Sequence, residues 1–353
     1  MITLPGLVQI SPSHAILLGN EIACDGFYDS CKVRVQTHAH QDHLKGFNSS
    51  KKTQEIYLTS ETRALMCTQK EYFGLNMACS NVHEIEQGKT FNISGHEVEL
   101  LHSNHILGGV QVRVKLPCGV CVGYSSDFNW PLDDVIQVDA LVLDSTGGHP
   151  NKVLEYTQGD AEAALLDIVK EAIVNGPVDI HGSQRGIVQR AMQVLSPMLP
   201  IDIPFICNEQ LEKETNVYRK YGYTIRPTTN ISGADGRDIM SKNKRYIRFR
   251  GKSDRKTLGG NRVTKITLSP FPSPNDNPVT VWSSGWPERS FSIGFYDHAD
   301  FKGTIEYVKN TEAQYVLTDT RGQYAFELAA ELRGCLGIKA KPSAYKESIE
   351  WGK

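Results

Sequence analysis

The chain has 353 residues, a formal net charge of −2 at pH 7 and a hydrophobic fraction of 40%. This length allows a large buried core and predicts one large domain or two of medium size. The near-neutral balance excludes bulk charge as the sign of a nucleic-acid partner, so only a local cluster of basic residues could indicate one. The sequence contains no run of 18 or more apolar residues, so we expect no membrane span.

Residues 1–13 lack a basic stretch followed by an apolar core, so they do not read as a signal peptide. We therefore expect a cytoplasmic protein, or a nuclear one if the source is eukaryotic, with its eight cysteines reduced. Cys118 and Cys121 are the one pair at metal-like spacing, and they lie between predicted strands at 109–116 and 120–124. Structural zinc normally needs four ligands, so this pair predicts a hairpin turn rather than a zinc knuckle.

The first part of the chain is dominated by short strands with apolar residues at alternate positions. These predicted strands are 32–36, 55–59, 98–102, 111–116, 121–124 and 140–144. Helices are predicted at 159–174 and 187–195 from their three- and four-residue apolar spacing. Residues 176–280 form a different segment, with short strands and a Pro-rich end at 269–274 that predicts a linker or rigid turn.

The last part of the chain returns to regular elements, predicted as strand 279–282, helix 302–309, strand 314–318 and helix 324–333. We find no internal repeat. This mixture of strands and helices indicates a layered α/β protein.

The strand at 32–36 leads into a run rich in metal-ligating residue types: His38, His40, Asp42 and His43. Imidazole and carboxylate are ligands that zinc and manganese favour. A compact turn can direct the first two side chains at one cation and the next two at a neighbouring cation. A lone histidine is more often structural, but three histidines and an aspartate so close together predict a metal site.

A dinuclear site needs further ligands, and the sequence offers them at strand ends. His105 follows the predicted strand at 98–102, and Asp127 follows the strand at 121–124. An aspartate directly after a strand is also a common turn residue, but the histidine run upstream favours Asp127 as a ligand. Asp25 is expected to support the histidines as a hydrogen-bond acceptor, with a plain Asp-Gly turn as the alternative.

With these residues in place, the sequence resembles the metallo-β-lactamase superfamily, whose signature is the histidine–aspartate run. Further motifs resemble its β-CASP nuclease branch: an acidic motif with Asp144, a Gly-x-x-Gln-Arg helix start at 186–190, Ser-Gly-Trp at 284–286 and Asp-His-Ala-Asp at 297–300. In order, spacing and length the chain is most similar to compact ligase-associated DNA exonucleases and to archaeal mRNA 3′-end processing exonuclease-like proteins.

The resemblance implies an αββα sandwich of the metallo-β-lactamase type with an inserted β-CASP lid. The core would comprise residues 1–170, the insertion 171–282 and the return to the core 283–353. It also implies two divalent cations, Zn²⁺ or Mn²⁺. The implied first-metal ligands are His38, His40 and His105; the implied second-metal ligands are Asp42 and His43, with Asp127 bridging.

The resemblance also places His298 over the metals with Asp144 beside it. A carboxylate in that position orients the imidazole ring and keeps it protonated near neutral pH. In the implied mechanism a hydroxide activated by the two metals attacks the phosphate, Asp42 belongs to the catalytic set, and His298 is the general acid for the leaving oxygen.

One position departs from the branch, which usually ends a strand with a second-metal histidine in a Thr-His-Gly pattern. Here the corresponding stretch is Thr318-Asp319-Thr320-Arg321-Gly322, so Asp319 stands in place of that histidine. Aspartate can ligate zinc or manganese, so we expect Asp319 to retain the ligand role. The alternative is a weakly held second metal and reduced activity.

Residues 242–265 hold ten basic side chains against one acidic side chain, Asp254, with Tyr246 and Phe249 interleaved. Such a strip suits a phosphate backbone, with aromatic rings available for base stacking. The alternative is a solvated charged face. The predicted nucleic-acid contacts are Arg245, Arg248, Arg250, Lys252 and Arg190.

The overall resemblance favours a DNA exonuclease that acts on single-stranded or end-exposed nucleic acid and associates with DNA ligase or repair proteins. An RNA 3′-end processing nuclease stays open, because discrimination of the 2′-hydroxyl depends on pocket contacts. A catalytically silent nucleic-acid-binding subunit also stays open through Asp319. A metallo-hydrolase of small substrates, such as thioesters or lactams, would need neither the motifs at Asp144 and His298 nor the strip at 242–265.

Overall fold

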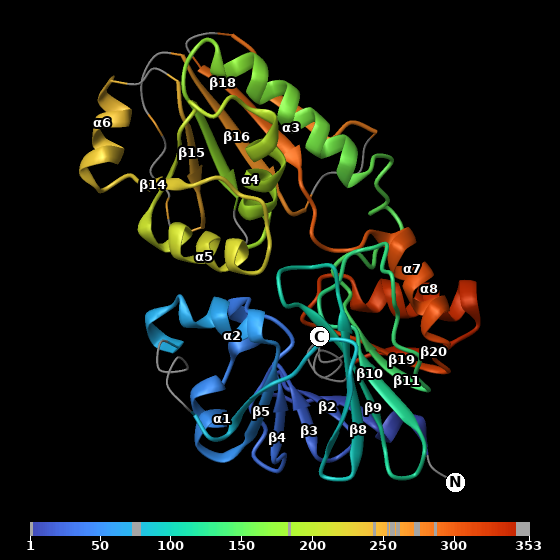
Figure 1. Cartoon of the computed structure of the whole chain (residues 1–353). Helices are drawn as coiled ribbons and strands as arrows, with labels where there is room; N and C mark the ends of the chain where they lie inside the picture. The colour runs from blue at the N-terminus through green and yellow to red at the C-terminus, as the bar shows by residue number, and fades with distance from the viewer. Residues whose placement is uncertain are drawn as a thin grey trace, which may run out of the picture. The chain divides into compact units, whose positions relative to one another are not determined.

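The computed structural model describes residues 3–72, 79–182, 185–242, 245–252, 254, 258, 262–271, 276–285 and 288–343. The chain divides into two compact units (Figure 1). Unit 1 consists of Met1–Val153 together with His298–Lys353, and unit 2 is the continuous stretch Leu154–Asp297. None of the helices in the described part of the chain combines the length and the hydropathy needed to cross a bilayer.

Sheet A of unit 1 has six strands in the order β1-β2-β3-β4-β5-β6. The first three are antiparallel neighbours, and β3 to β6 run parallel. The elements of this part of the chain are η1 (Leu4–Gly6), β1 (Val8–Ile10), β2 (Ile16–Leu18), β3 (Ile22–Cys24), β4 (Val33–Val35), η2 (Gln41–Leu44), α1 (Phe47–Thr53), β5 (Glu55–Leu58), α2 (Ser60–Cys67) and β6 (Val82–Glu84).

Sheet B of unit 1 has seven strands in the order β20-β19-β11-β10-β9-β8-β7. The strands β7 to β10 are antiparallel, whereas β10, β11, β19 and β20 are parallel. Their bounds are β7 (Thr90–Ile93), β8 (His96–His102), β9 (Val110–Lys115), β10 (Cys121–Tyr124), β11 (Ala140–Leu143), β19 (Tyr315–Thr318) and β20 (Lys339–Pro342). The turn between β9 and β10 confirms the predicted hairpin at Cys118 and Cys121.

The two sheets of unit 1 share one hydrophobic core. Val33 and Val35 of β4 belong to the same buried cluster as Val98 of β8 and Val112 of β9. The alternation of buried and less buried residues along β8 reflects this one-sided packing. The core between the sheets therefore forms from strands on both sides of the histidine run.

Helices cover the outer faces of this pair of sheets. Helices α7 (Phe301–Thr311) and α8 (Ala325–Leu336) pack on sheet B, where Leu141 and Val316 lie in one cluster with Tyr307 and Leu328. Helix α1 contacts β5 of sheet A, and α2 lies beside it (Figure 1). Strand β11 is buried on both faces, which explains its uninterrupted apolar sequence. This confirms the predicted α/β class with an αββα sandwich.

Unit 2 is built on sheet C, with seven strands in the order β14-β13-β15-β12-β16-β18-β17. All neighbours are parallel except the edge strand β17. Its elements are α3 (Gln158–Ile173), β12 (Val178–Gly182), α4 (Ile187–Met198), β13 (Phe205–Cys207), α5 (Glu209–Lys220), β14 (Thr228–Asn230), α6 (Ala234–Lys242), β15 (Ile247–Arg250), β16 (Val263–Ser269), β17 (Val279–Ser283) and β18 (Glu288–Gly294).

The boundaries of unit 2 differ from the insertion expected at 171–282. Helix α3 contacts α4, β12 and β18, so it belongs to unit 2 rather than to the sandwich. Strand β18 pairs with β16 along its whole length, which carries the unit on to Asp297. The chain therefore leaves unit 1 after Val153 and returns to it at His298.

Candidate metal centre

The predicted ligands lie in loops directly after strands of unit 1. His38 follows β4, His105 follows β8, and Asp127 follows β10. Strands β8, β10, β11 and β19 all run in the same direction, so their carboxyl ends meet at one edge of sheet B. Ligands of open α/β sheets characteristically bind at such an edge.

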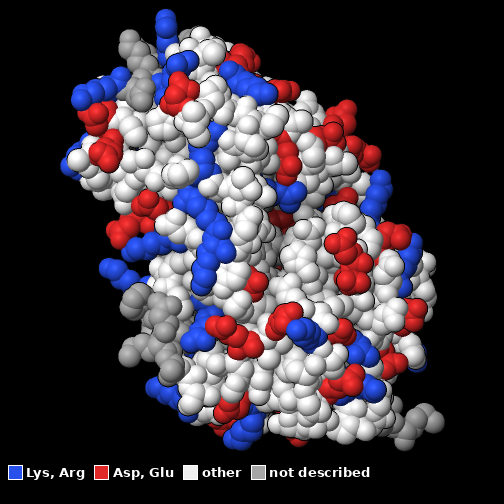
Figure 2. Space-filling model, in the orientation of Figure 1, with Lys and Arg blue, Asp and Glu red and all other residues white. Residues whose placement is uncertain are grey.

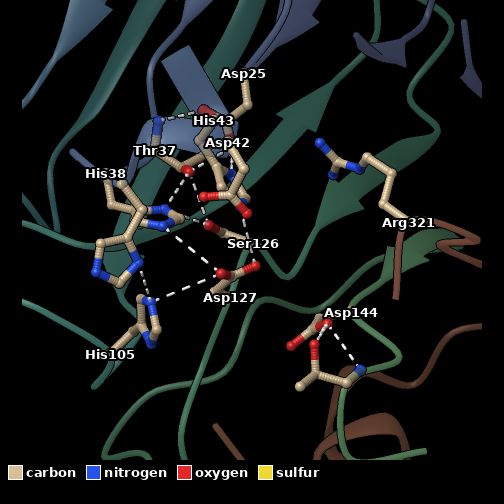
Figure 3. A network of polar contacts seen from close by, with 12 residues as sticks. Asp25, Thr37, His38, Asp42, His43, His105, Ser126, Asp127, Asp144 and Arg321 are labelled. Atoms are coloured by element: carbon tan, nitrogen blue, oxygen red, sulfur yellow. Dashed lines mark hydrogen bonds and ion pairs between the residues drawn. The ribbon is translucent and has the colours of Figure 1, made fainter. Parts of the chain in front are cut away.

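Four side chains converge at this edge and form the centre of the site; Figure 3 labels His38, His105 and Asp127 among them. One ligand atom from each of His38, His40, His105 and Asp127 lies within 4.8 Å of the others. Oδ2 of Asp127 is 3.7 Å from Nε2 of His38 and 3.6 Å from Nε2 of His105. Nε2 of His105 is 2.9 Å from Nδ1 of His40. Three imidazoles and one carboxylate form a four-ligand set of the kind that zinc takes.

The hydrogen bonds of His38 show which nitrogen faces this cluster. The Thr37 hydroxyl donates to Oδ2 of Asp25, so it is an acceptor for Nδ1 of His38 at 3.0 Å. Nε2 of His38 is buried and has no hydrogen-bond partner. Burial lowers the pKa of His38 well below its ordinary value, which keeps the ring neutral. A buried lone pair without a partner is costly unless it is bound, and a cation in the cluster would satisfy it.

Asp25 lies fully buried behind the histidine run, in the left-handed region at φ 54°. Its carboxylate accepts hydrogen bonds from the Thr37 amide at 2.8 Å and from Nε2 of Gln36 at 3.1 Å. It also lies 2.7 Å from Nδ1 of His43. This places Asp25 where a supporting acceptor is expected, and it turns Nε2 of His43 toward Asp127.

The two carboxylate oxygens of Asp127 face different histidines. Oδ2 faces His38 and His105, whereas Oδ1 lies 3.3 Å from Nε2 of His43. Burial opposes protonation of His43, but the nearby carboxylates of Asp127 and Asp25 raise its pKa well above the ordinary value. Burial likewise opposes ionisation of Asp127, but the charge of His43 holds its pKa well below the usual range. A carboxylate between two ligand groups in this way has the position of a bridge between two cations.

His298 and Asp144 lie beside this cluster, although they come from distant parts of the sequence. Nδ1 of His298 is 3.0 Å from Oδ2 of Asp144, and Nε2 of His298 is 3.9 Å from Oδ2 of Asp127. The other carboxylate oxygen of Asp144 accepts from the amide of Thr146 at 2.9 Å and from its hydroxyl at 2.7 Å. Asp144 is therefore fixed in place and orients the imidazole ring.

The structure does not bring Asp42 and Asp319 into the cluster in the same way. No group of three or more converging ligand atoms in the described residues includes either of them. Asp42 lies on the rim, with a side chain that is 75% exposed and an oxygen 3.7 Å from Nε2 of His43. It is therefore placed to complete a second cation position only from the solvent side.

Asp319 has a different role from the ligand role that we predicted. Its Oδ1 accepts from the amide of Arg321 at 2.9 Å, and its Oδ2 accepts from Nε of the same arginine at 2.7 Å and also from Nη2. Removing one partner of a buried ion pair typically costs about 3–5 kcal/mol. Asp319 therefore anchors Arg321, and the sequence could not show this because it does not give side-chain directions.

The predicted basic strip is in large part a buried strand, which corrects our expectation for two of its arginines. Arg248 and Arg250 lie in β15 and are 5% and 6% exposed. Arg248 forms an ion pair with Asp254 at 2.9 Å, and Arg250 forms one with Asp179 at 2.9 Å. Their guanidinium groups hold the strand to its surroundings and are not presented to a phosphate backbone.

The remaining predicted contacts differ in their surroundings. Tyr246 and Phe249 are buried and cannot stack on bases. Arg190 is paired with Glu162 at 2.5 Å, Arg245 lies 3.7 Å from Asp202, and Lys252 is exposed. Lys244, Arg255, Lys256 and Trp286 lie outside the described residues. On the face shown in Figure 2, basic and acidic side chains are interspersed.

Sequence reasoning did not identify the polar residues that hold the histidine loop. Arg34 is fully buried; its Nη2 donates to the carbonyl of His43 at 2.9 Å, and its Nη1 donates to the carbonyl of Lys45 at 3.0 Å. The Ser126 hydroxyl donates to the Thr37 hydroxyl at 2.7 Å. A charged residue at the centre of a short apolar strand was the one available signal for Arg34.

Two facing sheets flanked by helices, with a histidine–aspartate cluster at their strand ends, define an αββα protein with a candidate metal centre. The family model described as "Beta-lactamase superfamily domain" matches residues 31–181, which include the histidine run, Asp127 and Asp144. The chain belongs to the metallo-β-lactamase superfamily. Members of this superfamily are hydrolases, and their fold binds divalent metals.

Two individual proteins are similar to the chain. An "Uncharacterized protein in lig 3'region" of Acidianus ambivalens is 30% identical over 140 residues, which are 39% of this chain and 98% of that protein. A crystal structure of a protein of unknown function from Enterococcus faecalis V583 matches with a TM-score of 0.54 at 11% identity, over 81% of this chain and 74% of that one. The second similarity is one of fold.

Proposed function

We propose that this protein is a metal-dependent nuclease of the β-CASP branch, which removes nucleotides from a single-stranded or exposed end of DNA. The observation that carries the proposal is the pair formed by His298 and Asp144, 3.0 Å apart beside the ligand cluster. A hydrolase of the superfamily needs the cluster for its metals. The additional histidine, oriented by its own carboxylate, indicates a reaction with a leaving group that must be protonated.

A phosphodiester has such a leaving group, because the departing sugar alkoxide is strongly basic. A thioester does not need this assistance, because a thiolate leaves readily without a proton. Asp144 holds Nδ1 of His298 and leaves Nε2 facing the cluster, where it can donate a proton to the leaving oxygen. General acid catalysis of this kind contributes roughly 10²–10⁴-fold to the rate. The pair therefore supports phosphodiester hydrolysis over small thioester substrates.

The donor set around Asp127 favours zinc, since imidazoles dominate it, with manganese as the alternative. Divalent cations in such a site lower the pKa of bound water and offset the charge of phosphate oxygens. His38, His40 and His105 would hold the ion, and Asp127 would face it with Oδ2. Asp25 and Thr37 keep the histidine rings oriented from behind.

The chain order of the units supports the β-CASP assignment. Unit 2 enters the sequence after Val153 and ends at Asp297, between the two members of the acid pair. A small-molecule hydrolase of this fold needs no such insertion. The relative from Acidianus ambivalens is described by its position in a "lig 3'region". This supports DNA over RNA as the substrate and a role together with a DNA ligase or repair proteins.

The test uses the purified full-length chain with Zn²⁺ or Mn²⁺ and end-labelled single-stranded DNA and RNA oligonucleotides. We expect a ladder of products that starts at one end of the DNA. His298→Ala should keep the metal content of the wild type, measured by plasma mass spectrometry, and lose roughly 10²–10⁴-fold in rate. His83→Ala on β6 is the matched control, because this half-buried histidine pairs with Glu55 and belongs to none of the converging ligand groups of the described residues.

Three outcomes would count against the proposal in different ways. Normal cleavage by His298→Ala would remove the assignment of the acid. Cleavage of a chromogenic ester, with both oligonucleotides intact, would indicate a small-molecule hydrolase. Binding of the oligonucleotides without cleavage would indicate a catalytically silent binding subunit. A product ladder from RNA alone would indicate that the substrate is RNA and not DNA.

A further inference from the structure

Arg321 carries a positive charge that is fixed beside the candidate metal centre. It follows β19, and its side chain is 19% exposed. Nε and Nη2 bind the carboxylate of Asp319, and Nη2 also donates to the hydroxyl of Tyr124 at 3.0 Å. Nη1 donates to the carbonyl of His14 at 3.4 Å. A guanidinium group held at three points keeps one orientation.

The charge of Arg321 lies on the side of the centre where a second cation would bind. Figure 3 shows the guanidinium group facing the side on which Asp25, Asp42 and His43 lie. Its hydrogen-bond partner Tyr124 is the last residue of β10, which leads into the loop of Asp127. Burial opposes the charge of Arg321, but Asp319, Tyr124 and Asp25 raise its pKa well above the ordinary value.

The second cation position is less complete than the first. It is formed by Nε2 of His43 with Oδ1 of Asp127, and by the exposed side chain of Asp42 at 3.7 Å. Asp319, the expected further ligand, is already occupied by Arg321. A divalent cation at this position would also be repelled by the guanidinium charge in a largely buried environment. These residues can bind one cation firmly, but they do not fit a second cation bound with the same affinity.

The hydrogen-bond inventory of Arg321 leaves room for a substrate group. A guanidinium has five N–H donors. Four of them are used: one from Nε, two from Nη2 and one from Nη1. The remaining N–H of Nη1 is therefore available, on a side chain that is partly open to solvent. Arginine is well suited to phosphate oxygens, and its charge is permanent.

We infer that Arg321 takes the place of the second cation: the centre holds one ion firmly, and the guanidinium group binds a non-bridging oxygen of the substrate phosphate. This inference rests on the proposed function, since it assumes a phosphate in the site. Asp319 is then a positioning residue. Its carboxylate does not bind a metal ion but holds the guanidinium group of Arg321 in place.

The experiment measures metal content and phosphate affinity rather than cleavage. The wild-type chain is loaded with Zn²⁺, dialysed against metal-free buffer and analysed by plasma mass spectrometry. We expect one zinc ion per chain. Titration calorimetry with inorganic phosphate should then show binding that is about 10- to 100-fold weaker in Arg321→Met, the effect of losing a charge-assisted hydrogen bond. Arg321→Lys should retain part of the affinity because it keeps the charge.

Two further variants keep the test decisive. Arg321→Met leaves Asp319 buried without its partner, so the double variant Asp319→Asn with Arg321→Met removes both charges and should fold with the same loss of phosphate affinity. Arg63→Met is the matched control, because Arg63 is 20% exposed and pairs with Glu84 at 2.9 Å. Two firmly held zinc ions in the wild type, or unchanged phosphate affinity in Arg321→Met and in the double variant, would overturn the inference. Failure to cleave any nucleic acid, with these bindings as expected, would instead refute the proposed nuclease.

Discussion

Replacing Asp25 by asparagine should weaken metal binding at the candidate centre, although it changes none of the predicted ligands. Asp25 is fully buried with φ 54°, a conformation that asparagine tolerates better than most residues. The substitution therefore keeps the size and the backbone of the residue and removes the charge. It also places an amide NH₂ group opposite the hydrogen-bond donors of Thr37 and His43.

The magnitude follows from the contacts of this carboxylate. It accepts from the Thr37 amide at 2.8 Å, from the Thr37 hydroxyl at 2.5 Å and from Gln36 at 3.1 Å, and it meets His43 at 2.7 Å. Loss of one partner of such a buried charged pair costs about 3–5 kcal/mol of unfolding free energy. Residues that support metal-binding histidines typically contribute about 10- to 100-fold to metal affinity.

The assay is a competition for Zn²⁺ with a chromophoric chelator, combined with urea unfolding of the metal-free protein. Asp134→Asn is the control, because this exposed aspartate is also in unit 1 and its side chain faces solvent. We expect the control to match the wild type in both measurements. Wild-type zinc affinity in a folded Asp25→Asn protein would refute the view that Asp25 orients the histidines.

The remaining predictions concern metal removal, a loop and the buried strand. Chelation should lower the calorimetric unfolding midpoint of unit 1 and leave that of unit 2 unchanged, because ligand binding stabilises only the unit that holds the ion. Gly108→Ala should reduce zinc affinity, since the glycine has φ 78° and an added Cβ would meet three atoms at the start of α2 at 2.7 Å; Gly95→Ala, at φ 82° with open space, is the control and should bind zinc normally. Arg250→Ala should destabilise unit 2 by about 3–5 kcal/mol in urea unfolding, because Asp179 loses its buried partner, whereas the exposed Lys252→Ala should not. Weaker oligonucleotide binding by Arg250→Ala at unchanged stability would instead support the prediction that residues 242–265 bind a phosphate backbone.

The sequence was sufficient for the parts of the site that depend on residue type and on strand ends. His38, His40, His105 and Asp127 each follow a strand whose alternating or apolar pattern is visible in the sequence. Parallel strand ends meet at one edge of a sheet, so loops that are far apart in the chain converge there. The layered α/β class followed from the same patterns, whereas the αββα sandwich was implied by the family resemblance, and both are confirmed.

Other features depended on side-chain directions, which no pattern encodes. Asp319 and Arg321 stand two positions apart, and nothing in the sequence tells whether the carboxylate faces a metal or the arginine. Arg248 and Arg250 were predicted to contact a phosphate backbone, because the sequence shows the cluster of basic residues but not whether their side chains are exposed. Here both faces of β15 are buried and the two charges meet carboxylates.

The return of the chain at His298 has a consequence for the order in which the protein matures on the ribosome. Domains generally fold as units during synthesis, so the histidine run, β8 and β10 emerge early, and unit 2 follows before the sandwich is finished. Until β19 emerges, β11 presents an unpaired edge, and such edges are prone to pair with other chains. Unit 1 is completed only by the residues from His298 onward, which also supply the acid and the fixed arginine. The metal centre can therefore take its final form only after the whole of unit 2 has been synthesised.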